Sequence, residues 1–345
     1  MCVRGLTGSE SVDQRPRLAD VAARAGVSTA SVSLVLRGAP GPSAETRERV
    51  LAAAADLSYR ADRTASLLAR RRRHLLGVLL DVRNPFHAEL VEEVHAEADQ
   101  AGYEVVLSTL TRDRDEARAI ETLLDFRCEA LVLLGPDASD DALGKLAAQV
   151  PCVVVGRPVA DADVDVVRPA EDVGVDAALH HLIALGHSRI TFVDGGRGAV
   201  AANRRRGYRR AMRRAGLVAE VLPGDHTEEG GVRAGRRIIA EHVLPTAVVA
   251  SNDRLAVGVM DAFVRAGVDV PGQVSVVGYD DSILARLAHI DLTSVNQDAP
   301  AQARHAVRAA VSRLDAGRTA RMETVLVPHL VVRGSTAAPR ADQRV

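Results

Sequence analysis

The stretch LADVAARAGVSTASVSLVLRG, residues 18–38, contains two short apolar-periodic segments on either side of one glycine. In the first segment, apolar residues fall at i, i+3, i+4 and i+7, on one face of a helix: Leu18, Val21, Ala22 and Ala25. Gly26 follows, where a left-handed residue can end the helix. Ser28 can cap a second helix, whose apolar face is Val32, Val35 and Leu36. Two helices joined by a tight turn with glycine predict a helix-turn-helix.

A third helical pattern completes a small all-α domain. It begins near Ser43, which can cap it, and it has Glu45 in its first turn. Its apolar face is expected to bury Val50, Leu51, Ala54 and Leu57. We therefore predict a helix-turn-helix domain over residues 17–60, preceded by a disordered tail over residues 1–16. Residues 61–74 have few apolar positions, and we interpret them as a hinge or linker that becomes helical only against a partner.

The pattern changes at Leu75, where apolar strands begin to alternate with amphipathic helices. The predicted strands are 75–80, 103–108, 130–134, 152–155, 190–193, 247–250 and 275–279, and the predicted long helices are 171–185, 204–215 and 253–266. This alternation predicts two parallel, doubly wound sheets in an α/β unit of two lobes with a cleft between them. The expected bounds are about 75–169 and 297–326 for lobe 1, about 170–296 and 327–334 for lobe 2, and 335–345 for a disordered polar tail.

Charge is divided unevenly along the chain. Residues 1–74 contain thirteen arginines and seven acidic residues, whereas the whole chain has a formal net charge of −1. A basic head on an acidic body is typical of a domain that meets a polyanion such as DNA. The three cysteines are widely spaced without a CxxC pair, so we expect neither a disulfide framework nor a metal site. No segment has the composition of a signal peptide or a membrane span, which favours a cytoplasmic protein.

The second helix of the head has an outer face suited to DNA. The side chains that avoid its apolar face are mostly small or hydroxyl-bearing: Thr29, Ala30, Ser31, Ser33 and Leu34. Such side chains let a helix enter the major groove and reach base edges or phosphates. Ser43 and Thr46, at the start of the third helix, could hold a phosphate. A purely structural helix pair is the alternative interpretation.

Eight segments in the same order resemble the LacI/GalR (lactose-repressor) family of transcription regulators. They are LADVAARAGVSTASVSLVLRG, SAETRERVLAAAADLSYRADRTASLLA, NPFHAELVEEV, HHLIALGHSRITFV, ASNDRLAVGVMDAF, VSVVGYDDS, LTSVNQD and VPHLVVRGS. The resemblance implies a DNA-binding head, a hinge helix and a two-lobed effector domain similar to periplasmic sugar-binding proteins. It also implies a homodimer that represses transcription from a near-palindromic DNA operator. A small polar ligand, such as a sugar, would control it allosterically, without a cofactor or catalytic residues.

The resemblance extends the expected DNA contacts beyond the second helix. The residues expected to contact bases, backbone or groove edge are Ser28, Thr29, Ala30, Ser31, Ser33, Leu34, Arg37, Ser43, Thr46, Tyr59, Arg63 and Leu68. Leu68 matches the hinge leucine that enters the minor groove, where an apolar wedge between base steps bends DNA. Packing of Leu68 against its dimer mate is the alternative. Leu34 stands where many relatives have arginine, so guanine recognition from that position is not expected.

The resemblance also implies a ligand pocket between the lobes. The residues expected to line or support it are Phe86, Arg204, His226, Asn252, Asp253, Asp280 and Gln297. Arginine, asparagine and aspartate supply the donors and acceptors that a polyhydroxylated ligand needs. Gly156 and His226 stand where sugar-responsive relatives have an aspartate and an aromatic residue, which favours a ligand different from a plain hexose.

Four of these pocket assignments have a structural alternative. Helix capping is the alternative for Asn252 and Asp253. A role in a turn is the alternative for Asp280, and packing in the core is the alternative for Phe86.

One motif favours a different class of protein. Gly196, Gly198 and Ala201 form G-x-G-x-x-A after the apolar run 190–193, with Glu220 about 20 residues further on. This spacing is the fingerprint of a dinucleotide site, so a nucleotide-cofactor enzyme is an alternative function. No acid–base pair or nucleophile accompanies these glycines. A cytoplasmic sugar-binding protein without a DNA role is a further alternative.

Overall fold

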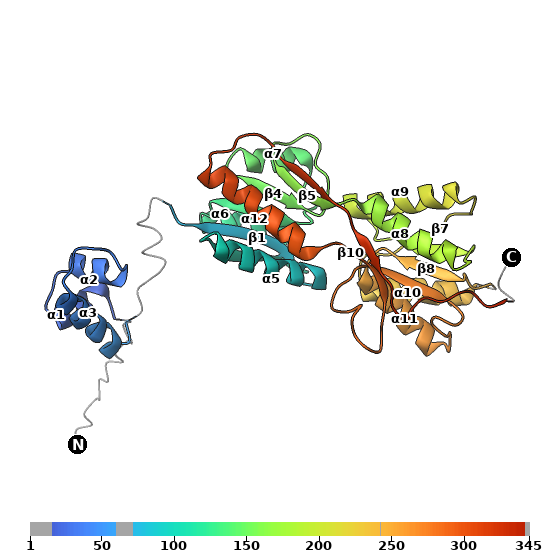
Figure 1. Ribbon diagram of the computed structural model, residues 1–345, viewed down its shortest axis with the longest axis horizontal. Coiled ribbons are helices and arrows are strands. Elements are labelled where there is room, and N and C mark those ends of the chain that lie inside the picture. The colour runs from blue at the N-terminus through green and yellow to red at the C-terminus, as the bar shows by residue number, and fades with distance from the viewer. Residues whose placement is uncertain (1–15, 60–71, 242, 342–345) are drawn as a thin grey trace, which may run out of the picture. The chain divides into compact units, whose positions relative to one another are not determined.

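The computed structural model describes residues 16–59, 72–241 and 243–341 (Figure 1). Residue contacts divide the chain into a head unit, which ends at Arg73, and an effector unit, which begins at His74. Within residues 16–59 of the head unit, the helices are α1 (Leu18–Ala25), α2 (Thr29–Leu36) and α3 (Ala44–Asp56). Within the described residues, no single helix is long and apolar enough to cross a membrane. Taken together, α1 and α2 reach that threshold on length and composition only, and they are bent by 102° at their junction.

The head unit folds around a small apolar core. Its buried members are Val21, Ala22, Ala25, Val32, Val35, Val50, Ala53 and Ala54. The prediction that Leu51 is buried is wrong, because its side chain is 51% exposed. The buried positions of α3 repeat from Val50 at intervals of three and four residues, and Leu51 lies about 100° further round the helix. The core face of α3 is therefore narrower than the sequence suggests.

The effector unit contains two sheets, one in each lobe. The sheet of lobe 1 has the strand order β11-β5-β4-β3-β1-β2, and that of lobe 2 has the order β12-β10-β9-β8-β6-β7. The strands are β1 (Leu75–Asp81), β2 (Glu104–Leu110), β3 (Ala130–Leu134), β4 (Cys152–Val155), β5 (Asp165–Pro169), β6 (Ile190–Val193), β7 (Glu220–Leu222), β8 (Ala247–Ala250), β9 (Ser275–Asp280), β10 (Thr293–Asn296), β11 (Glu323–Leu326) and β12 (His329–Val331). All neighbouring pairs are parallel except β10 and β12.

Helices cover both sheets. They are α5 (Pro85–Gln100), α6 (Glu116–Asp125), α7 (Asp140–Ala147), α8 (Glu171–Ala184), α9 (Ala199–Arg214), α10 (Glu228–Ala240), α11 (Asp253–Arg265) and α12 (Ala299–Asp315). In lobe 1, α5 and α12 share one apolar core with the sheet. In lobe 2, α8 and α9 share one core with the sheet, while α10 and α11 share another (Figure 1). The doubly wound α/β architecture predicted from the sequence is confirmed.

The seven predicted strands correspond to β1, β2, β3, β4, β6, β8 and β9. The five that the sequence pattern missed have three to five residues each. They include three strands at the edges of the two sheets, β7, β11 and β12. Each missed strand includes polar residues that interrupt its apolar run, whereas the equally short β4 and β8 are wholly apolar. The chain passes between the lobes three times within the described residues, between β5 and α8, β10 and α12, and β11 and β12.

The segment after Gly334 is ordered, so the prediction of a disordered tail is wrong for residues 335–341. Ser335 is 2% exposed, and its hydroxyl accepts from the backbone of Thr293 at 2.8 Å and donates to that of Val276 at 2.6 Å. Ala337 makes two hydrogen bonds with Ser275. This segment lies against β9 and β10, and its polar residues satisfy backbone groups of those strands. Residues 342–345 lie outside the described part of the chain.

Candidate functional site

The two helices of the helix-turn-helix meet at a fixed turn. Gly26 ends α1 in the left-handed conformation, with φ +65°, which favours glycine. From α3, the guanidinium of Arg49 donates to the carbonyl oxygens of Ala25 and Gly26 at 3.2 Å each. The 102° bend between α1 and α2 falls within the range typical of helix-turn-helix motifs. Arg49 thus ties α3 to the end of α1 and to the turn that leads into α2.

The outer face of α2 consists of the residues predicted to contact DNA. Thr29 and Ala30 are exposed, whereas Ser33 and Leu34 are partly exposed, opposite the buried Val32 and Val35. The Ser28 hydroxyl caps α2 by accepting from the backbone of Ser31 at 3.1 Å, and the two hydroxyls are 3.0 Å apart. Their hydrogen-bonding capacity is therefore partly used within the helix. Arg37, just after α2, is exposed.

The start of α3 provides hydroxyl groups. Ser43 caps α3 by accepting from the backbone of Thr46 at 3.2 Å, and its hydroxyl donates to that of Thr46 at 3.0 Å. Tyr59 is partly buried against the head core, which favours packing as well as the predicted DNA contact. The predictions for Arg63 and Leu68 lie outside the described residues.

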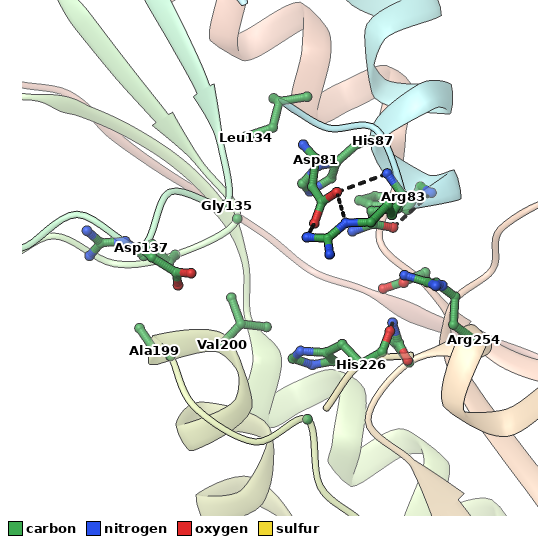
Figure 2. A pocket seen from close by; sticks show the side chains of 18 of the residues that line it. Asp81, Arg83, His87, Leu134, Gly135, Asp137, Ala199, Val200, His226 and Arg254 are labelled. Atoms are coloured by element: carbon green, nitrogen blue, oxygen red, sulfur yellow. Dashed lines mark hydrogen bonds and ion pairs between the residues drawn. The ribbon is translucent and has the colours of Figure 1, made fainter. Parts of the chain in front are cut away.

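A cavity of about 590 Å³ lies in the effector unit between the two lobes (Figure 2). Its walls come from the carboxyl ends of strands in both sheets, the usual position of ligand sites in open α/β sheets. Of the seven predicted pocket residues, six line it: Phe86, Arg204, His226, Asn252, Asp280 and Gln297. Side chains from helices of both lobes and from several loops therefore converge on one polar space.

Arg204 lies at the centre of the charged groups in this space. The residue is 4% exposed, and its guanidinium donates to both carboxylate oxygens of Glu171, at 2.6 and 3.2 Å. It also donates to the carbonyl oxygen of Ser251 at 2.6 Å and lies 3.5 Å from a carboxylate oxygen of Asp280. Its carbon Cζ is 3.6 Å from the ring centroid of Tyr279. Burial alone would lower the pKa of Arg204, but Glu171, Tyr279 and Asp280 raise it, so the group stays charged.

Asp280 and Gln297 form a second buried polar pair in the cavity. The side-chain amide of Gln297 donates to Asp280 at 2.6 Å. Burial raises the pKa of the Asp280 carboxyl well above its usual range, although the nearby Arg204 cation lowers it. A buried carboxyl with a raised pKa beside a fixed cation is typical of a binding site.

His226 forms part of the lobe-2 wall, and its pKa is well below the usual value because the ring is buried. Its Nε2 lies 3.1 Å from the Ser251 hydroxyl. Burial and then the Arg204 cation lower the pKa of His226 to about 4, so the ring is neutral at pH 7. A Cβ at Gly195 would lie 2.0 Å from this ring, so only glycine leaves room for it. The ring is therefore held between the loops that follow β6, β7 and β8.

Asp253 is not among the cavity-lining residues, so it can only support the site. The carboxylate accepts from the backbone and hydroxyl of Ser282 at 2.7 and 2.8 Å and from the Ser294 hydroxyl. Burial raises its pKa to about 7, against these hydrogen bonds. Its neighbour Asn252 lines the cavity and caps α11 by accepting from the backbone of Leu255 at 3.0 Å. Asn252 thus has both of the roles that the sequence left open.

Sequence reasoning missed the lobe-1 wall beside Phe86. Asp81, Arg83 and His87 line the cavity opposite His226 and Arg254 (Figure 2). Arg83 pairs with both oxygens of Asp81, at 2.9 and 2.8 Å. The backbone of Asp81 donates to His87 Nδ1 at 3.1 Å, which leaves Nε2 as the protonated nitrogen of a neutral ring. Asp81 directly follows the predicted strand 75–80. Its place at the carboxyl end of a strand was the feature of the sequence that could have identified this wall.

We predict that His87 makes the effector unit less stable in acid. Burial lowers its folded pKa from 6.5 to about 4. At a pH between these two pKa values, His87 binds a proton in the unfolded chain but not in the folded chain. Protonation therefore favours unfolding, and the free energy of unfolding falls with pH by up to about 3 kcal/mol. His87→Gln should remove this component. Urea denaturation of both proteins between about pH 7.5 and about pH 4.5 measures the difference. Parallel pH profiles would show that the ring stays accessible to protons.

The lobes also touch beside the cavity. Glu89 on α5 accepts from the backbone of Ile283 at 2.6 Å and pairs with Arg286 at 2.6 Å. Both partners lie in the lobe-2 loop after β9. Together with the three chain crossings, this bridge connects the lobes beside the cavity.

Family matches cover both units. Residues 17–62 match the lacI family of bacterial regulatory proteins, and residues 179–336 match the periplasmic binding protein-like domain. The chain is 35% identical over 343 residues to the HTH-type transcriptional regulator MalR of Streptomyces coelicolor, covering 95% of this chain and 98% of that protein. It is 33% identical over 324 residues to the ribose operon repressor of Escherichia coli, covering 92% and 98%. The chain belongs to the LacI family.

Solved structures of this family have the same fold. The Lac repressor dimer bound to operator and the anti-inducer ONPF is 31% identical, with a TM-score of 0.80 over 94% of this chain and 100% of that chain. A complex of the regulator CelR with cellobiose is 32% identical, with a TM-score of 0.70 over 93% and 100%. Membership in the LacI family identifies the chain as a DNA-binding transcriptional regulator and not an enzyme.

The glycine-rich loop of this LacI-family chain does not indicate a nucleotide enzyme. Gly196 and Gly198 line the effector cavity at the start of α9. A Cβ at Gly196 would lie 2.9 Å from the carbonyl oxygen of Gly224, so the glycine permits two loops of the cavity to pack together. Glu220 accepts from the Thr191 hydroxyl at 2.8 Å, between neighbouring strands. The fingerprint spacing arises here from loop packing.

Proposed function

We propose that the protein is a homodimeric repressor that binds a near-palindromic operator and responds to a saccharide in the cavity between its lobes. The observation that carries this proposal is the buried set of Arg204, Asp280, Gln297 and Asn252 in a cavity of about 590 Å³. That volume suits a small ligand, and the set offers cationic donors, amides and a carboxyl to hydroxyl groups. The cellobiose complex and the ribose operon repressor among the similar proteins support this ligand class.

The two lobes contribute differently to the proposed site. Lobe 2 supplies Arg204, His226 and Asn252, which are fixed by contacts within that lobe. Lobe 1 supplies the Phe86 wall and the Nε2 donor of His87. A ligand that contacts both walls favours one separation of the lobes over another, which is the requirement for an allosteric response. In a dimer, this separation would change how the two heads are spaced on DNA.

The head unit is proposed to place α2 in the major groove. The exposed Thr29 and Ala30, with Ser33, Leu34 and Arg37, would face bases and backbone, and Ser28 and Ser31 would approach through their remaining hydroxyl capacity. Ser43 and Thr46 would contact a phosphate at the start of α3. Tyr59, Arg63 and Leu68 stay predictions, as does the cytoplasmic location.

Selection of bound duplexes from a randomised DNA pool, using the full chain, tests the first half of this proposal. Enrichment of one near-palindrome is the expected result. The operator affinity is then measured with ribose, galactose, maltose or cellobiose present, and NAD as the control for a nucleotide ligand. We expect at least one saccharide to change the affinity about tenfold, and NAD to have no effect. A folded protein that enriches no duplex would overturn the repressor assignment. A response to NAD alone would overturn the assignment of a saccharide as the ligand.

A further inference from the structure

The outer face of α2 consists of two neighbouring rows with different chemistry. Thr29 and Ser33, four residues apart, form a hydroxyl row. Ala30 and Leu34, also four residues apart, form an apolar row beside it. Thr29 and Ala30 are exposed, and Ser33 and Leu34 are partly exposed. The face presented outward is therefore half hydroxyl and half aliphatic.

Leu34 is not needed for the fold of the head. Within residues 16–59, the buried core and the partly buried residues packed against it do not include Leu34. The neighbouring Leu36, by contrast, packs against that core. An aliphatic side chain that is partly exposed and outside the core is available for an intermolecular contact.

No charged side chain competes for the bases along α2. The helix and its cap, from Ser28 to Leu36, carry no ionisable group. The first charge is Arg37, whose Nε donates to the carbonyl oxygen of Ser33 at 3.1 Å, so its guanidinium folds back along its own helix. From Ser28 to Leu36 there is thus no arginine that could make the common bidentate contact with guanine.

The apolar row matches one feature of the major groove. Each base pair presents donors and acceptors there, and only thymine adds an apolar group, its C5-methyl. We propose that Ala30 and Leu34 recognise thymine methyl groups. The base pairs of the operator half-site that face this apolar row then contain thymine. This inference rests on the proposed function, because it requires α2 to lie in the groove.

Uracil substitution tests the inference because it removes the methyl group and keeps every hydrogen-bonding group of the base. In the selected operator, each thymine is replaced by uracil in both half-sites, and the affinity of the full chain is measured. At the position under Leu34 we expect affinity to fall roughly tenfold, the combined effect of one buried methyl lost in each half-site. Leu34→Ala should bind the thymine and uracil operators within about twofold of each other at that position.

The matched control is Leu51→Ala, which truncates an exposed leucine of α3 in the same unit. It should keep the full preference of the unmodified protein for thymine, and thermal melting should show both variants folded. Uracil without effect at every position, or a Leu34→Ala protein that keeps the thymine preference, would overturn the methyl contact while leaving the repressor assignment in place. Failure to enrich any duplex would instead overturn both.

Discussion

Arg204→Ala should lower the free energy of unfolding of the effector unit by about 3–5 kcal/mol and abolish the response to the saccharide. The reason is the fully buried network around the guanidinium. Without it, the Glu171 carboxylate, 4% exposed, loses both guanidinium donors, and the carbonyl oxygen of Ser251 loses its hydrogen bond from the same group. Urea denaturation measures the loss of stability, and operator binding with and without saccharide measures the response.

Destabilisation and loss of binding must be separated in this experiment. Arg209→Ala, an exposed arginine on the same helix, is the matched control and should change stability by less than about 0.5 kcal/mol. The double variant Glu171→Gln with Arg204→Gln removes both charges, so it should be more stable than Arg204→Ala alone and still fail to respond. A double variant that responds normally would remove Arg204 from the ligand site. Equal stability of Arg204→Ala and the unmodified protein would contradict the buried ion pair.

The regular parts of the fold could be predicted because their signals repeat along the sequence. Capping residues and the glycine turn define α1 and α2, and the apolar runs of the central strands define most of both sheets. Periodicity gave the wrong result for Leu51, because the pattern shows which residues are apolar but not how wide a face the partner helices cover. The ordered segment at Ser335 was missed because it is held by hydrogen bonds from a serine hydroxyl to strand backbone groups, which leave no apolar pattern.

The site was less accessible to prediction than the fold. Arg204, Asn252, Asp280 and Gln297 were assigned to the cavity through the resemblance, whereas periodicity alone placed none of them there. His87 belongs to the cavity because the two sheets face each other across it. Sequence spacing within one lobe carries no information about how far apart the walls of the two lobes lie. Asp253 differs from its neighbour Asn252 only by one step along α11, and that step turns its carboxylate toward Ser282 and Ser294.

Gly258→Ala should destabilise the effector unit by about 3 kcal/mol, because α10 and α11 cross at glycines. A Cβ at Gly258 would lie 2.0 Å from the carbonyl oxygen of Glu228 and 2.9 Å from the Cα of Gly231. A Cβ at Gly231 would in turn lie 2.2 Å from the carbonyl oxygen of Leu255. These neighbours are backbone atoms, so no side-chain rotation relieves the clash and the helices must move apart.

Gly144→Ala is the matched control for this crossing. It also lies within a helix, but its added Cβ would meet only the Cβ of Ala162, at an ordinary 3.7 Å. Because alanine favours helix more than glycine does, this variant should be more stable by about 0.5–1 kcal/mol. Thermal and urea unfolding of both variants measures the contrast.

Because α10 begins at Glu228, directly after the cavity residues Asp225, His226 and Thr227, Gly258→Ala should also weaken saccharide binding. A Gly258→Ala protein as stable as the Gly144→Ala protein would mean that the two helices do not cross in backbone contact.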